Sequence, residues 1–569
     1  MGGFGLNGSD EEGMATRLWN KFKNERVSVL YSPFIICLAS GTLDSHTFLH
    51  CISQDVYFSS NIFAQAYELA EEYADDDEDK EAITKLRKRV LKRLRNLDTL
   101  IHEWGFEPPK ESACQTATVK YTEFLLETAA GKVGGEKFPG KIVTPFEKTK
   151  LAAYTLSAIA PCMRLYNFVS KEILALIEPE ESEHIYKKWL NSLSSEKFEA
   201  SAGRIEVMLD KLSISLTGEE LEVVERLYHK SMKLELEFIL TQSVVNRTIA
   251  PISQLYNSAE ENLIIFCDFD LTCTAIDSSA LLAEIAIVAA SKADLSGGET
   301  QPSKTSSSDI RMMWSNLFSQ YIEEYEQCIE SIMSNEAVKG LDYEGLCKAL
   351  EQISNFEKRA NSRVIDSNLL GGLSLTDIKR AGEHLSFQDG CKQFFKDLMK
   401  SETRATDFHV LSYCWCDDLI KSAFSSGDLC VPNVHSNCLV YEESISTGNI
   451  IQKMESPMDK LRVFNDITKD STNDSKPLTV YIGGSFGDLL SLLEADFGIV
   501  FGLSDCLMKL GSRFGISFVP LFSGLVNKQR ELDVSGCLNR KGSSGVLYTV
   551  SSWDEINTFI LGAKQVPPS

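Results

Sequence analysis

The sequence predicts a multidomain protein in which an all-α helical region is followed by an α/β region with a helical cap. Apolar residues recur at spacings of three and four from about residue 14 to 243, which is the periodicity of helices that bury one face. Over 386–562, short apolar runs alternate with helix-like segments, as in a parallel sheet covered by helices. A second helical block at 279–385 separates two strand-like segments, which is the position of a cap.

The helices of the first region follow from this apolar spacing. Residues 1–13 are acidic and rich in glycine, and we expect them to be disordered. Turn residues such as Pro108 and Pro109 separate the helical segments, and Thr217 with Glu220 has the spacing of a capping box. The predicted helices are 46–74, 80–104, 115–131, 147–177, 182–193, 196–212 and 217–243.

The boundary between the regions is predicted at 244–262, a polar linker that contains Pro251. The α/β core is expected to comprise 263–278 and 386–562, and the cap 279–385. Within the cap, the segment SGGETQPSKTSSSD at 296–309 is polar and of low complexity, so we expect a flexible insert there.

Composition excludes several classes of function. The chain of 569 residues is 43% hydrophobic and 24% charged, which is typical of a globular protein. A net charge of −24 argues against nucleic acid as a partner, because such binding depends on Lys and Arg at phosphates. No apolar run reaches the roughly 18 residues of a membrane span. We therefore expect small-molecule substrates as partners, with no nucleic acid and no membrane.

The 15 cysteines are not preceded by a secretory signal, which favours a reducing compartment. The acidic N-terminus is unlike an arginine-rich transit peptide. We expect a cytoplasmic location for the sequence as it stands, and a mitochondrial one if a longer precursor carries a transit peptide.

Residues Leu263 to Cys267 form an apolar run that ends in Asp268 and Asp270. In an extended strand, residues two apart point to the same side, so both carboxylates could address one ligand. One could attack a phosphorus atom while the other moves a proton. The alternative is an ordinary strand that ends in a polar loop. Three further polar residues follow in order near strand-like or helix-like segments: Ser412, Lys460 and Asp488.

This order of residues resembles the four motifs of the haloacid dehalogenase (HAD) phosphatase superfamily. The resemblance implies that Asp268 is the nucleophile that becomes an aspartyl-phosphate and that Asp270 is the general acid/base. Ser412 would hydrogen-bond the phosphoryl oxygens, and Lys460 would neutralise their charge. The implied cofactor is Mg²⁺, whose ligands would be Asp268, the backbone carbonyl of Asp270, and Asp488.

One position departs from the motif. Members of the superfamily commonly have Asp where this chain has Gly484, and that carboxylate ligates Mg²⁺ directly. Because Mg²⁺ demands oxygen ligands in near-octahedral geometry, the loss predicts weak metal binding. The substitution Gly484→Asp is accordingly expected to tighten it.

Three polar side chains stand out in the helical region. Asp55 lies in an apolar helix with Phe58 three residues on, and Cys162 is followed one turn later by Tyr166. Glu235 is surrounded by leucines, and a carboxylate buried on a helix needs a partner or a ligand. Each has a structural alternative: a bridge between helices for Asp55, a core position for Cys162, and a solvated helix face for Glu235.

With PC-xx-LY at 161–166, Gln54-Asp55 and YTEFLL at 121–126, these residues resemble the TenA family of thiamine-salvage hydrolases, which are all-α bundles. The match runs over roughly 20–243. The resemblance implies that Cys162 attacks the ring carbon that bears the leaving amine. Asp55 would orient the aminopyrimidine, and Glu235 would shuttle protons. The aromatic side chains that would line or stack in the pocket are Phe58, Tyr121 and Tyr166.

A TenA-like region followed by a HAD phosphatase resembles the family of plant bifunctional thiamine-salvage enzymes. That implies hydrolysis of aminomethylpyrimidine to hydroxymethylpyrimidine and ammonia, and dephosphorylation of thiamine monophosphate to thiamine. One alternative is an aminopyrimidine hydrolase whose HAD domain is weakened or disabled and serves as a binding module. Another is a purely binding or regulatory protein. The sequence leaves open whether a homo-oligomer forms through the TenA-like region.

Overall fold

The computed structural model describes residues 12–58, 63–73, 77–106, 114–133, 136–137, 144–177, 184–255, 262–295, 306–333, 340–400, 406–426, 429, 433–469, 477–536 and 545–563. Disorder was predicted for 1–13 and a flexible insert for 296–309; of these, residues 1–11 and 296–305 lie outside the described part of the chain. The chain divides into two compact units. The helical unit comprises Met1–Pro251, Leu525–Leu538 and Gly562–Ser569, and the α/β unit comprises Ile252–Gly524 and Asn539–Leu561.

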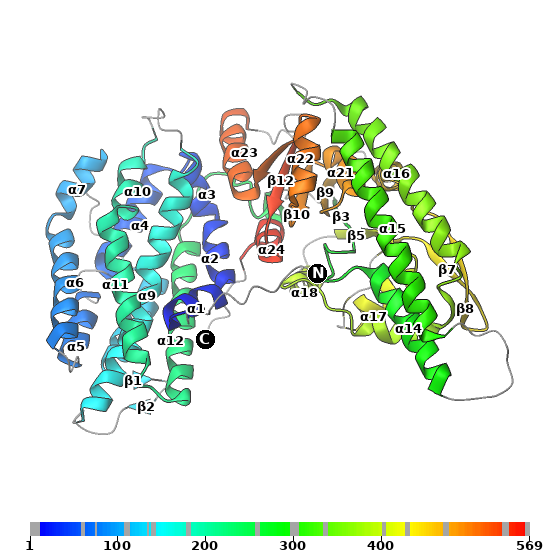
Figure 1. The fold of residues 1–569 in the computed structure, drawn as a ribbon. Coiled ribbons are helices and arrows are strands. Elements are labelled where there is room, and N and C mark those ends of the chain that lie inside the picture. The colour runs from blue at the N-terminus through cyan, green and yellow to red at the C-terminus, as the bar shows by residue number, and fades with distance from the viewer. Residues whose placement is uncertain are drawn as a thin grey trace. The chain divides into compact units, whose positions relative to one another are not determined.

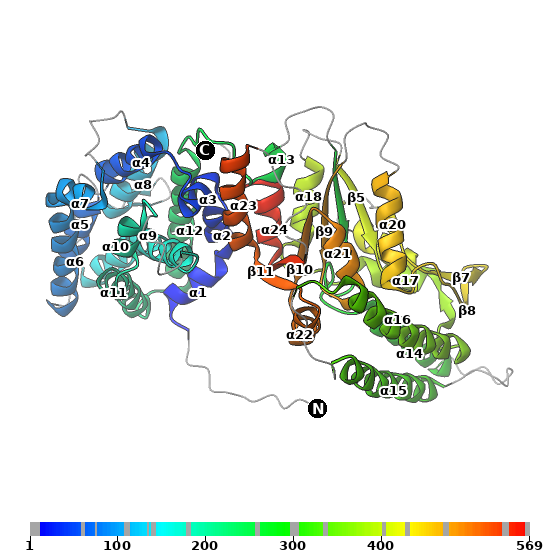
Figure 2. The same cartoon turned by 90° about the horizontal axis from the view of Figure 1, so that it is seen from above.

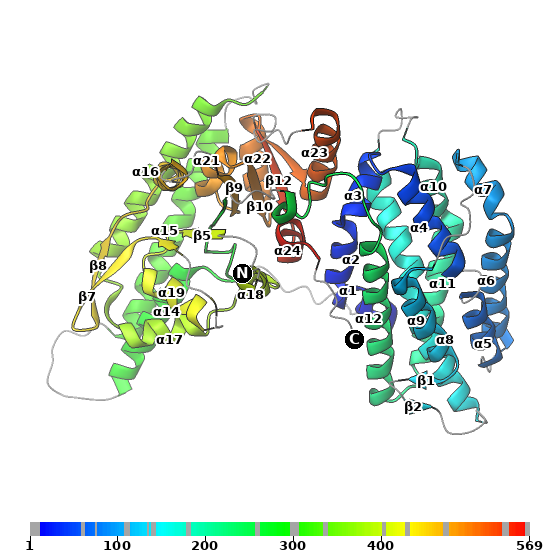
Figure 3. The same ribbon diagram turned by 180° about the vertical axis from the view of Figure 1, so that it is seen from behind.

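The helical unit is a bundle around the long helix α9, which packs against α5, α8, α10, α11 and α12. Figure 3 shows α8, α9 and α12 running side by side. The elements are α1 (Met14–Lys21), α2 (Lys23–Leu30), α3 (Pro33–Ser40), α4 (Ser45–Phe58), α5 (Ala64–Tyr73), α6 (Asp77–Arg95), α7 (Leu97–Trp104), α8 (Thr116–Ala129), β1 (Lys132–Val133), β2 (Glu136–Lys137), α9 (Pro145–Leu174), α10 (Lys187–Leu193), α11 (Glu196–Ser213) and α12 (Gly218–Leu240).

Local sequence explains where the two main helices begin. Thr144 and Thr217 each accept a hydrogen bond from the backbone three residues on, and the acids there bond back to the cap. The box at Thr217 confirms the sequence prediction. Pro161 lies inside α9 without ending it. The predicted helix 80–104 is divided into α6 and α7 on either side of Asn96. The predicted helix 46–74 is described as α4 and α5, and residues 59–62 between them lie outside the described part of the chain.

The α/β unit is built on a seven-stranded sheet in the order β11-β12-β10-β9-β3-β5-β6, in which all neighbouring strands are parallel. The elements from Ile252 onwards are α13 (Ile252–Leu255), β3 (Leu263–Cys267), α14 (Ser278–Leu295), α15 (Ser307–Met333), α16 (Tyr343–Asp366), β4 (Gly371–Ser374), α17 (Leu375–Glu383), α18 (Cys391–Lys400), β5 (Thr406–Leu411), α19 (Asp417–Ser425), β6 (Asn433–His435), β7 (Cys438–Glu442), β8 (Ile445–Ile451), α20 (Pro457–Lys469), β9 (Leu478–Gly483), a 3-10 turn at Phe486–Asp488, α21 (Leu489–Glu494), β10 (Phe497–Phe501), α22 (Asp505–Arg513), β11 (Ser517–Pro520), α23 (Leu521–Ser535), β12 (Val546–Val550) and α24 (Trp553–Leu561). From Leu525 onwards, α23 belongs to the helical unit.

Helices cover both faces of this sheet. Figure 2 shows α18 and α24 on one face and α20 and α21 on the other. The central strands β3, β9 and β10 are buried along their whole length, which is why their sequences are continuous apolar runs. On the α20 face the core includes Phe266, Tyr481 and Val500, and it extends to Leu350 of α16. An all-α region followed by a parallel α/β core with added helices confirms the predicted fold class.

The cap segment differs in part from expectation. Figure 1 shows α14, α15 and α16 as a layer of long helices close to β7 and β8. Residues 438–451 were expected in the core, but as β7 and β8 they form a separate antiparallel sheet with β4 of the cap segment. The Ser446 hydroxyl of β8 donates a hydrogen bond to the carbonyl of Leu370, which directly precedes β4, at 2.5 Å.

Two further segments are more ordered than predicted. Ser307–Asp309, at the end of the expected insert, is the first turn of α15, where Ser306 caps the backbone of Asp309 at 3.2 Å. In the expected linker, Ile252 begins the short helix α13 and is buried, as is Ile249. Within the described ranges, no helix is both long and apolar enough to cross a bilayer.

Candidate active sites

The first site lies in the helical unit, where four helices contribute one side chain or more. Asp55 comes from α4, Tyr121 from α8, Cys162 and Tyr166 from α9, and Glu235 from α12. Since Cys162 and Tyr166 are one turn apart, they lie on the same face of α9. The structure therefore brings together every residue predicted for this site whose side chain it describes. The side chain of Phe58 lies outside the described residues.

These residues surround a cavity of about 10 Å³, which has room for roughly one water molecule. Asp55, Cys162 and Tyr166 also line a second cavity of about 590 Å³, which extends to Tyr67 and Trp189. The thiol thus lies between a small acidic pocket and a larger space that can hold a ring-sized substrate.

Glu235 is 2% exposed, and its burial raises the pKa of the carboxyl group to about 7. The charge of Asp55 also raises the pKa. Interactions with Cys162 and Tyr121 lower it, but they do not outweigh the effect of burial. Glu235 Oε1 has no hydrogen-bond partner among the described residues. A buried acid that is about half protonated near neutral pH is suited to moving a proton.

The sequence did not single out Ser231, which holds Tyr121 in place. Its hydroxyl lies 3.0 Å from the Tyr121 hydroxyl and donates to the carbonyl of Ala158 at 2.8 Å. Ser231 precedes Glu235 by four residues on α12, so it faces the same side of the helix. That spacing was the signal that could have identified it.

The second site lies at the carboxyl ends of three adjacent strands, where parallel α/β sheets bind their ligands. Asp268 directly follows β3, Ser412 follows β5, and Gly484 follows β9. Lys460 comes from the first turn of α20. The strand order β9-β3-β5 explains how residues more than 200 positions apart meet at this edge.

Lys460 connects two carboxylates. Its ammonium lies 2.9 Å from Asp268 Oδ1 and 2.8 Å from Asp488 Oδ1. It also lies over the ring of Tyr413, 4.4 Å from the ring centre. Lys460 and Asp488 are completely buried, and Asp268 is 5% exposed. One buried cation therefore compensates two buried anions, which leaves the cluster with excess negative charge.

This imbalance affects the two acids differently. Burial and the nearby Asp488 charge raise the pKa of Asp268, and Lys460 opposes them only in part. Burial acts to raise the pKa of Asp488 too, but Lys460 and Ser485 outweigh it and the pKa is lowered. An additional cation at the edge would favour the ionised, nucleophilic form of Asp268.

Asp488 has no room for a further ligand. Oδ1 accepts hydrogen bonds from Lys460 and from the Tyr481 hydroxyl at 2.8 Å, and Oδ2 accepts from the Ser485 amide at 2.9 Å and hydroxyl at 2.6 Å. A carboxylate has about four lone-pair sites, and four donors occupy them. The geometry therefore does not fit the prediction that Asp488 ligates Mg²⁺, and it assigns Asp488 to the support of Lys460.

Asp270 occupies the opposite side of the edge. Its carboxylate accepts hydrogen bonds from the Ser278 amide at 2.7 Å and hydroxyl at 3.0 Å, and the Ser412 hydroxyl lies at 3.5 Å. Burial and the charge of Asp277 raise the pKa of Asp270 to about 7, despite the bonds from Ser278. An acid with this pKa can both donate and accept a proton near neutrality.

The residues at this edge form a sparse site for Mg²⁺. In the described part of the chain, no three His, Cys, Asp or Glu side chains are arranged to hold a metal ion. Asp268 and the backbone carbonyl of Asp270 are the remaining candidates. Such a set fits a Mg²⁺ ion that keeps several waters and takes further oxygens from a substrate phosphate.

Gly484 is constrained by its surroundings. A Cβ atom there would lie 2.6 Å from the backbone oxygen of Phe501 in the neighbouring strand. Any side chain, an aspartate included, therefore requires the backbone to move. This contact was invisible in the sequence, and it weakens the expectation that Gly484→Asp would simply restore a metal ligand.

Comparisons with known proteins find partial similarities to solved structures. No family model matches the chain. Part of it is similar to a TenA family transcription regulator from a Silicibacter species, at 19% identity over 40% of this chain and 96% of that one, with a TM-score of 0.33. Part is similar to a phosphoserine phosphatase, at 18% identity over 44% of this chain and 91% of that one, with a TM-score of 0.28. Similarities of this size carry no inference about activity.

One curated relative covers almost the whole chain. The bifunctional TH2 protein of Arabidopsis thaliana, described as mitochondrial, is 52% identical over 558 residues, which span 97% of this chain and 90% of the relative. At this identity and coverage both regions are shared in one order on one polypeptide. The chain therefore belongs to the family of the bifunctional TH2 protein.

Proposed function

We propose that the chain is a bifunctional thiamine-salvage enzyme. The helical unit would hydrolyse aminomethylpyrimidine to hydroxymethylpyrimidine and ammonia, and the α/β unit would dephosphorylate thiamine monophosphate to thiamine. The observation that carries the proposal is that each unit places a nucleophile beside a buried acid whose pKa is about 7: Cys162 beside Glu235, and Asp268 beside Asp270. Membership of a family named for a bifunctional protein supports it.

In the helical unit, the Cys162 thiolate would attack the methylene carbon that bears the amine, and its C–N bond would break. This carbon lies outside the ring, which corrects the ring carbon implied by the resemblance, because the product is a hydroxymethylpyrimidine. Protonated Glu235 would give its proton to the departing nitrogen, so that ammonia leaves. Glu235 would then take a proton from water as the oxygen displaces the thiolate, which yields the alcohol. Asp55 would accept a hydrogen bond from the aminopyrimidine, and Tyr121 and Tyr166 would enclose the ring.

In the α/β unit, the Asp268 carboxylate would attack phosphorus while Asp270 protonates the departing alcohol oxygen. A water deprotonated by Asp270 would then attack the aspartyl-phosphate, releasing inorganic phosphate and restoring Asp268. Ser412 would donate a hydrogen bond to the phosphoryl group, and the ammonium of Lys460 would hold the charge of the buried acids. A Mg²⁺ ion bound by Asp268 and the Asp270 carbonyl would neutralise charge on the phosphate oxygens.

A second candidate function for the α/β unit is favoured by Gly484 and by the saturated Asp488. With so few protein ligands for the metal, this unit could serve as a slow phosphatase or as a module that binds phosphate esters without turnover. The helical unit would then be the one efficient enzyme of the chain.

The experiment uses the full chain. Ammonia release from aminomethylpyrimidine and phosphate release from thiamine monophosphate are measured separately, the second over a magnesium titration. We expect both products, with phosphate release that requires Mg²⁺. Ammonia without phosphate at any magnesium concentration would select the second candidate. Neither product would contradict the proposal as a whole.

The Arabidopsis relative is described as mitochondrial. We extend that location to this protein as part of the proposal, for a precursor that carries a transit peptide. Fractionation of cells that express the full-length precursor tests it.

A further inference from the structure

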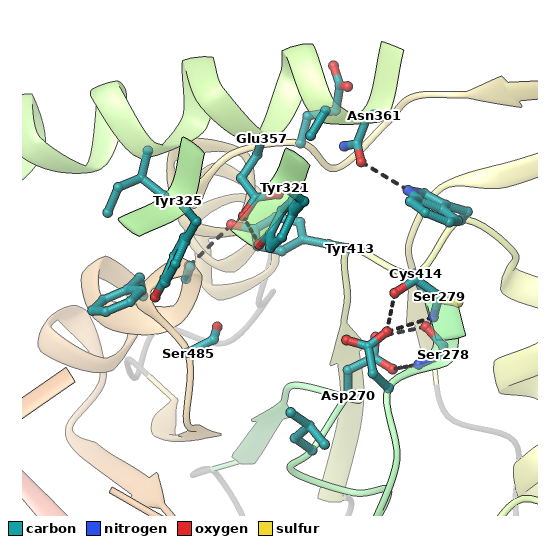
Figure 4. Close-up of a pocket in the computed structure, with 18 of the residues that line it drawn as sticks. Asp270, Ser278, Ser279, Tyr321, Tyr325, Glu357, Asn361, Tyr413, Cys414 and Ser485 are labelled. Carbon is teal, nitrogen blue, oxygen red and sulfur yellow. Dashed lines mark hydrogen bonds between the residues drawn. The ribbon is translucent and has the colours of Figure 1, made fainter. Parts of the chain in front are cut away.

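A cavity of about 550 Å³ lies beside the second site, between the edge that carries Asp268 and the cap helices α15 and α16. Figure 4 shows Glu357, Tyr321 and Tyr325 on the helical side and Asp270, Ser278 and Ser279 on the opposite side. Among the described residues, seven aromatic side chains line the cavity: Trp314, Phe318, Tyr321, Tyr325, Tyr413, Trp415 and Phe486. A ligand that reaches from the phosphate position towards the cap is therefore surrounded by aromatic rings.

The charged groups in this wall are mostly anionic. They include Asp268 and Asp270 of the second site, and also Glu357 and Glu455. The cationic lining residue is Arg363, whose guanidinium is held by both oxygens of Glu324 at 2.5 and 3.0 Å. The lining of the cavity therefore has excess negative charge. It would attract a ligand whose phosphate lies at one end and whose positive charge lies at the other end.

Glu357 of α16 is the acid best placed to meet such a charge. It accepts a hydrogen bond from the Tyr321 hydroxyl at 2.7 Å, and this bond fixes its position among the rings. Burial raises the pKa of its carboxyl group, which shows that its charge is poorly compensated by the protein alone. A cation on the ligand would supply that compensation, and electron-rich ring faces would add to it.

We propose that this cavity selects phosphate esters that carry a cationic heteroaromatic ring, with Glu357 and the surrounding aromatic rings as the specificity residues for the ring. The inference rests on the proposed phosphatase function for the orientation of the ester. It goes beyond that function by naming the feature that is recognised, the positive charge, and the residue that recognises it.

The test uses two ligands that differ by one methyl group and one charge. These are 4-methyl-5-(2-phosphooxyethyl)thiazole, whose ring is neutral, and its N-methyl thiazolium derivative. Neither contains a pyrimidine for which the helical site would compete. Binding is measured by calorimetry with Mg²⁺, in the full chain carrying Asp268→Asn, which removes the nucleophile so that the esters are not consumed.

We expect the cationic ester to bind about tenfold more tightly, which is roughly 1.4 kcal/mol. Adding Glu357→Gln should reduce this preference to about twofold or less, mainly through weaker binding of the cation. The matched control is Glu351→Gln, which removes the same charge from an exposed position of α16 outside the cavity and should leave the preference intact. Phe318→Leu, at a side chain that is 52% exposed, should weaken binding of the cation by about threefold without endangering the fold.

Equal binding of the two esters by the parent protein would overturn the inference, and so would a preference that survives Glu357→Gln. Hydrolysis of p-nitrophenyl phosphate by the natural chain separates this inference from the proposed function. If that ester is hydrolysed but no preference for the cation exists, the specificity inference alone fails. If the preference exists but no ester is hydrolysed, the phosphatase proposal alone fails.

Discussion

The helical site and the α/β site each place a residue proposed as the nucleophile beside a buried acid, but they compensate buried charge differently. In the helical site, none of the described residues that line the pocket around Glu235 is Lys or Arg, and burial raises the pKa of this acid to about 7. In the α/β site Lys460 lies between Asp268 and Asp488, and the pKa of Asp488 is lowered. The comparison shows that a neighbouring cation does not by itself keep a buried carboxyl group ionised: Lys460 lowers the pKa of Asp488, but the pKa of Asp268 beside it stays raised.

This difference matches the chemistry proposed for each unit. Expulsion of an amine needs an acid that can give up a proton, which suits Glu235 without a cation. Attack on a phosphoryl group needs an ionised nucleophile and positive charge nearby; Lys460 supplies part of that charge to Asp268, and a bound Mg²⁺ ion would supply more. The following predictions test the contrast, from the largest expected effect to the smallest.

The largest effect should be the reciprocal loss of activity in Cys162→Ser and Asp268→Asn. Cys162→Ser should abolish ammonia release and leave phosphate release within about twofold of normal, and Asp268→Asn should do the reverse. Each nucleophile contributes a covalent step that water alone replaces poorly, so losses of at least about 10³-fold are expected. Both activities are assayed on the same preparations. A single substitution that removes both would mean that the sites are not chemically separate.

Removing the shared cation should destabilise the α/β unit most. Lys460→Met leaves two buried carboxylates without compensation, at a cost of about 3–5 kcal/mol. Hydrogen exchange at the amides of β3 and β9 should accelerate accordingly, while amides of α9 in the helical unit should not change. Pairing it with Asp488→Asn should recover part of the loss. Unchanged exchange in Lys460→Met would show that the acids are already protonated.

Glu235 should make the helical unit less stable as pH rises. Its pKa of about 7 in the folded chain is above its ordinary 4.5, so between these values the folded state binds more protons than the unfolded state. The associated stability is present below about pH 4.5 and is lost by about pH 7, and it is on the order of 3 kcal/mol. Glu235→Gln removes this dependence.

Between pH 5 and pH 8, the Tm of the natural chain should therefore fall relative to the Tm of Glu235→Gln. The control is Glu222→Gln, which lies on the same helix with a side chain 76% exposed. If both variants follow the natural chain in parallel, the Glu235 carboxyl group has an ordinary pKa.

The smallest effect concerns two glycines. Gly484→Ala should lower the stability of the α/β unit by about 1–3 kcal/mol, because the new methyl group meets the Phe501 carbonyl oxygen. Gly203→Ala in α11 meets nothing within 4 Å and should stabilise the helical unit by up to about 1 kcal/mol. Thermal unfolding of both variants checks the opposite signs. If Gly484→Ala is neutral, the strand end adapts freely and Gly484→Asp becomes a practical way to add a metal ligand.

The sequence predicted those parts of the fold and of the candidate sites that depend on residues close together along the chain. The run before Asp268 is apolar without interruption, so it predicted a central strand, and the helical spacing of Cys162 and Tyr166 predicted a shared face. The sheet formed by β4, β7 and β8 was not predicted, because β4 has only four residues and pairs with β8 across more than 60 residues.

The rest depended on contacts between distant segments. Nothing near Asp488 in the sequence indicates that Tyr481 and Lys460 saturate its Oδ1, and nothing near Gly484 indicates the carbonyl of Phe501. The role of Glu357 could not be found either, since one acid in a long polar helix shows no pattern. It became visible only with the rings of the other elements around it.

The most direct test of the account is to trap the covalent intermediate of the α/β unit. The full chain is mixed with thiamine monophosphate and Mg²⁺, quenched in acid during turnover, and analysed by peptide mass spectrometry. The account predicts one added phosphoryl group on the peptide that contains Asp268, present in Cys162→Ser and absent in Asp268→Asn. Steady phosphate release with no such adduct, or release that persists in Asp268→Asn, would contradict the account.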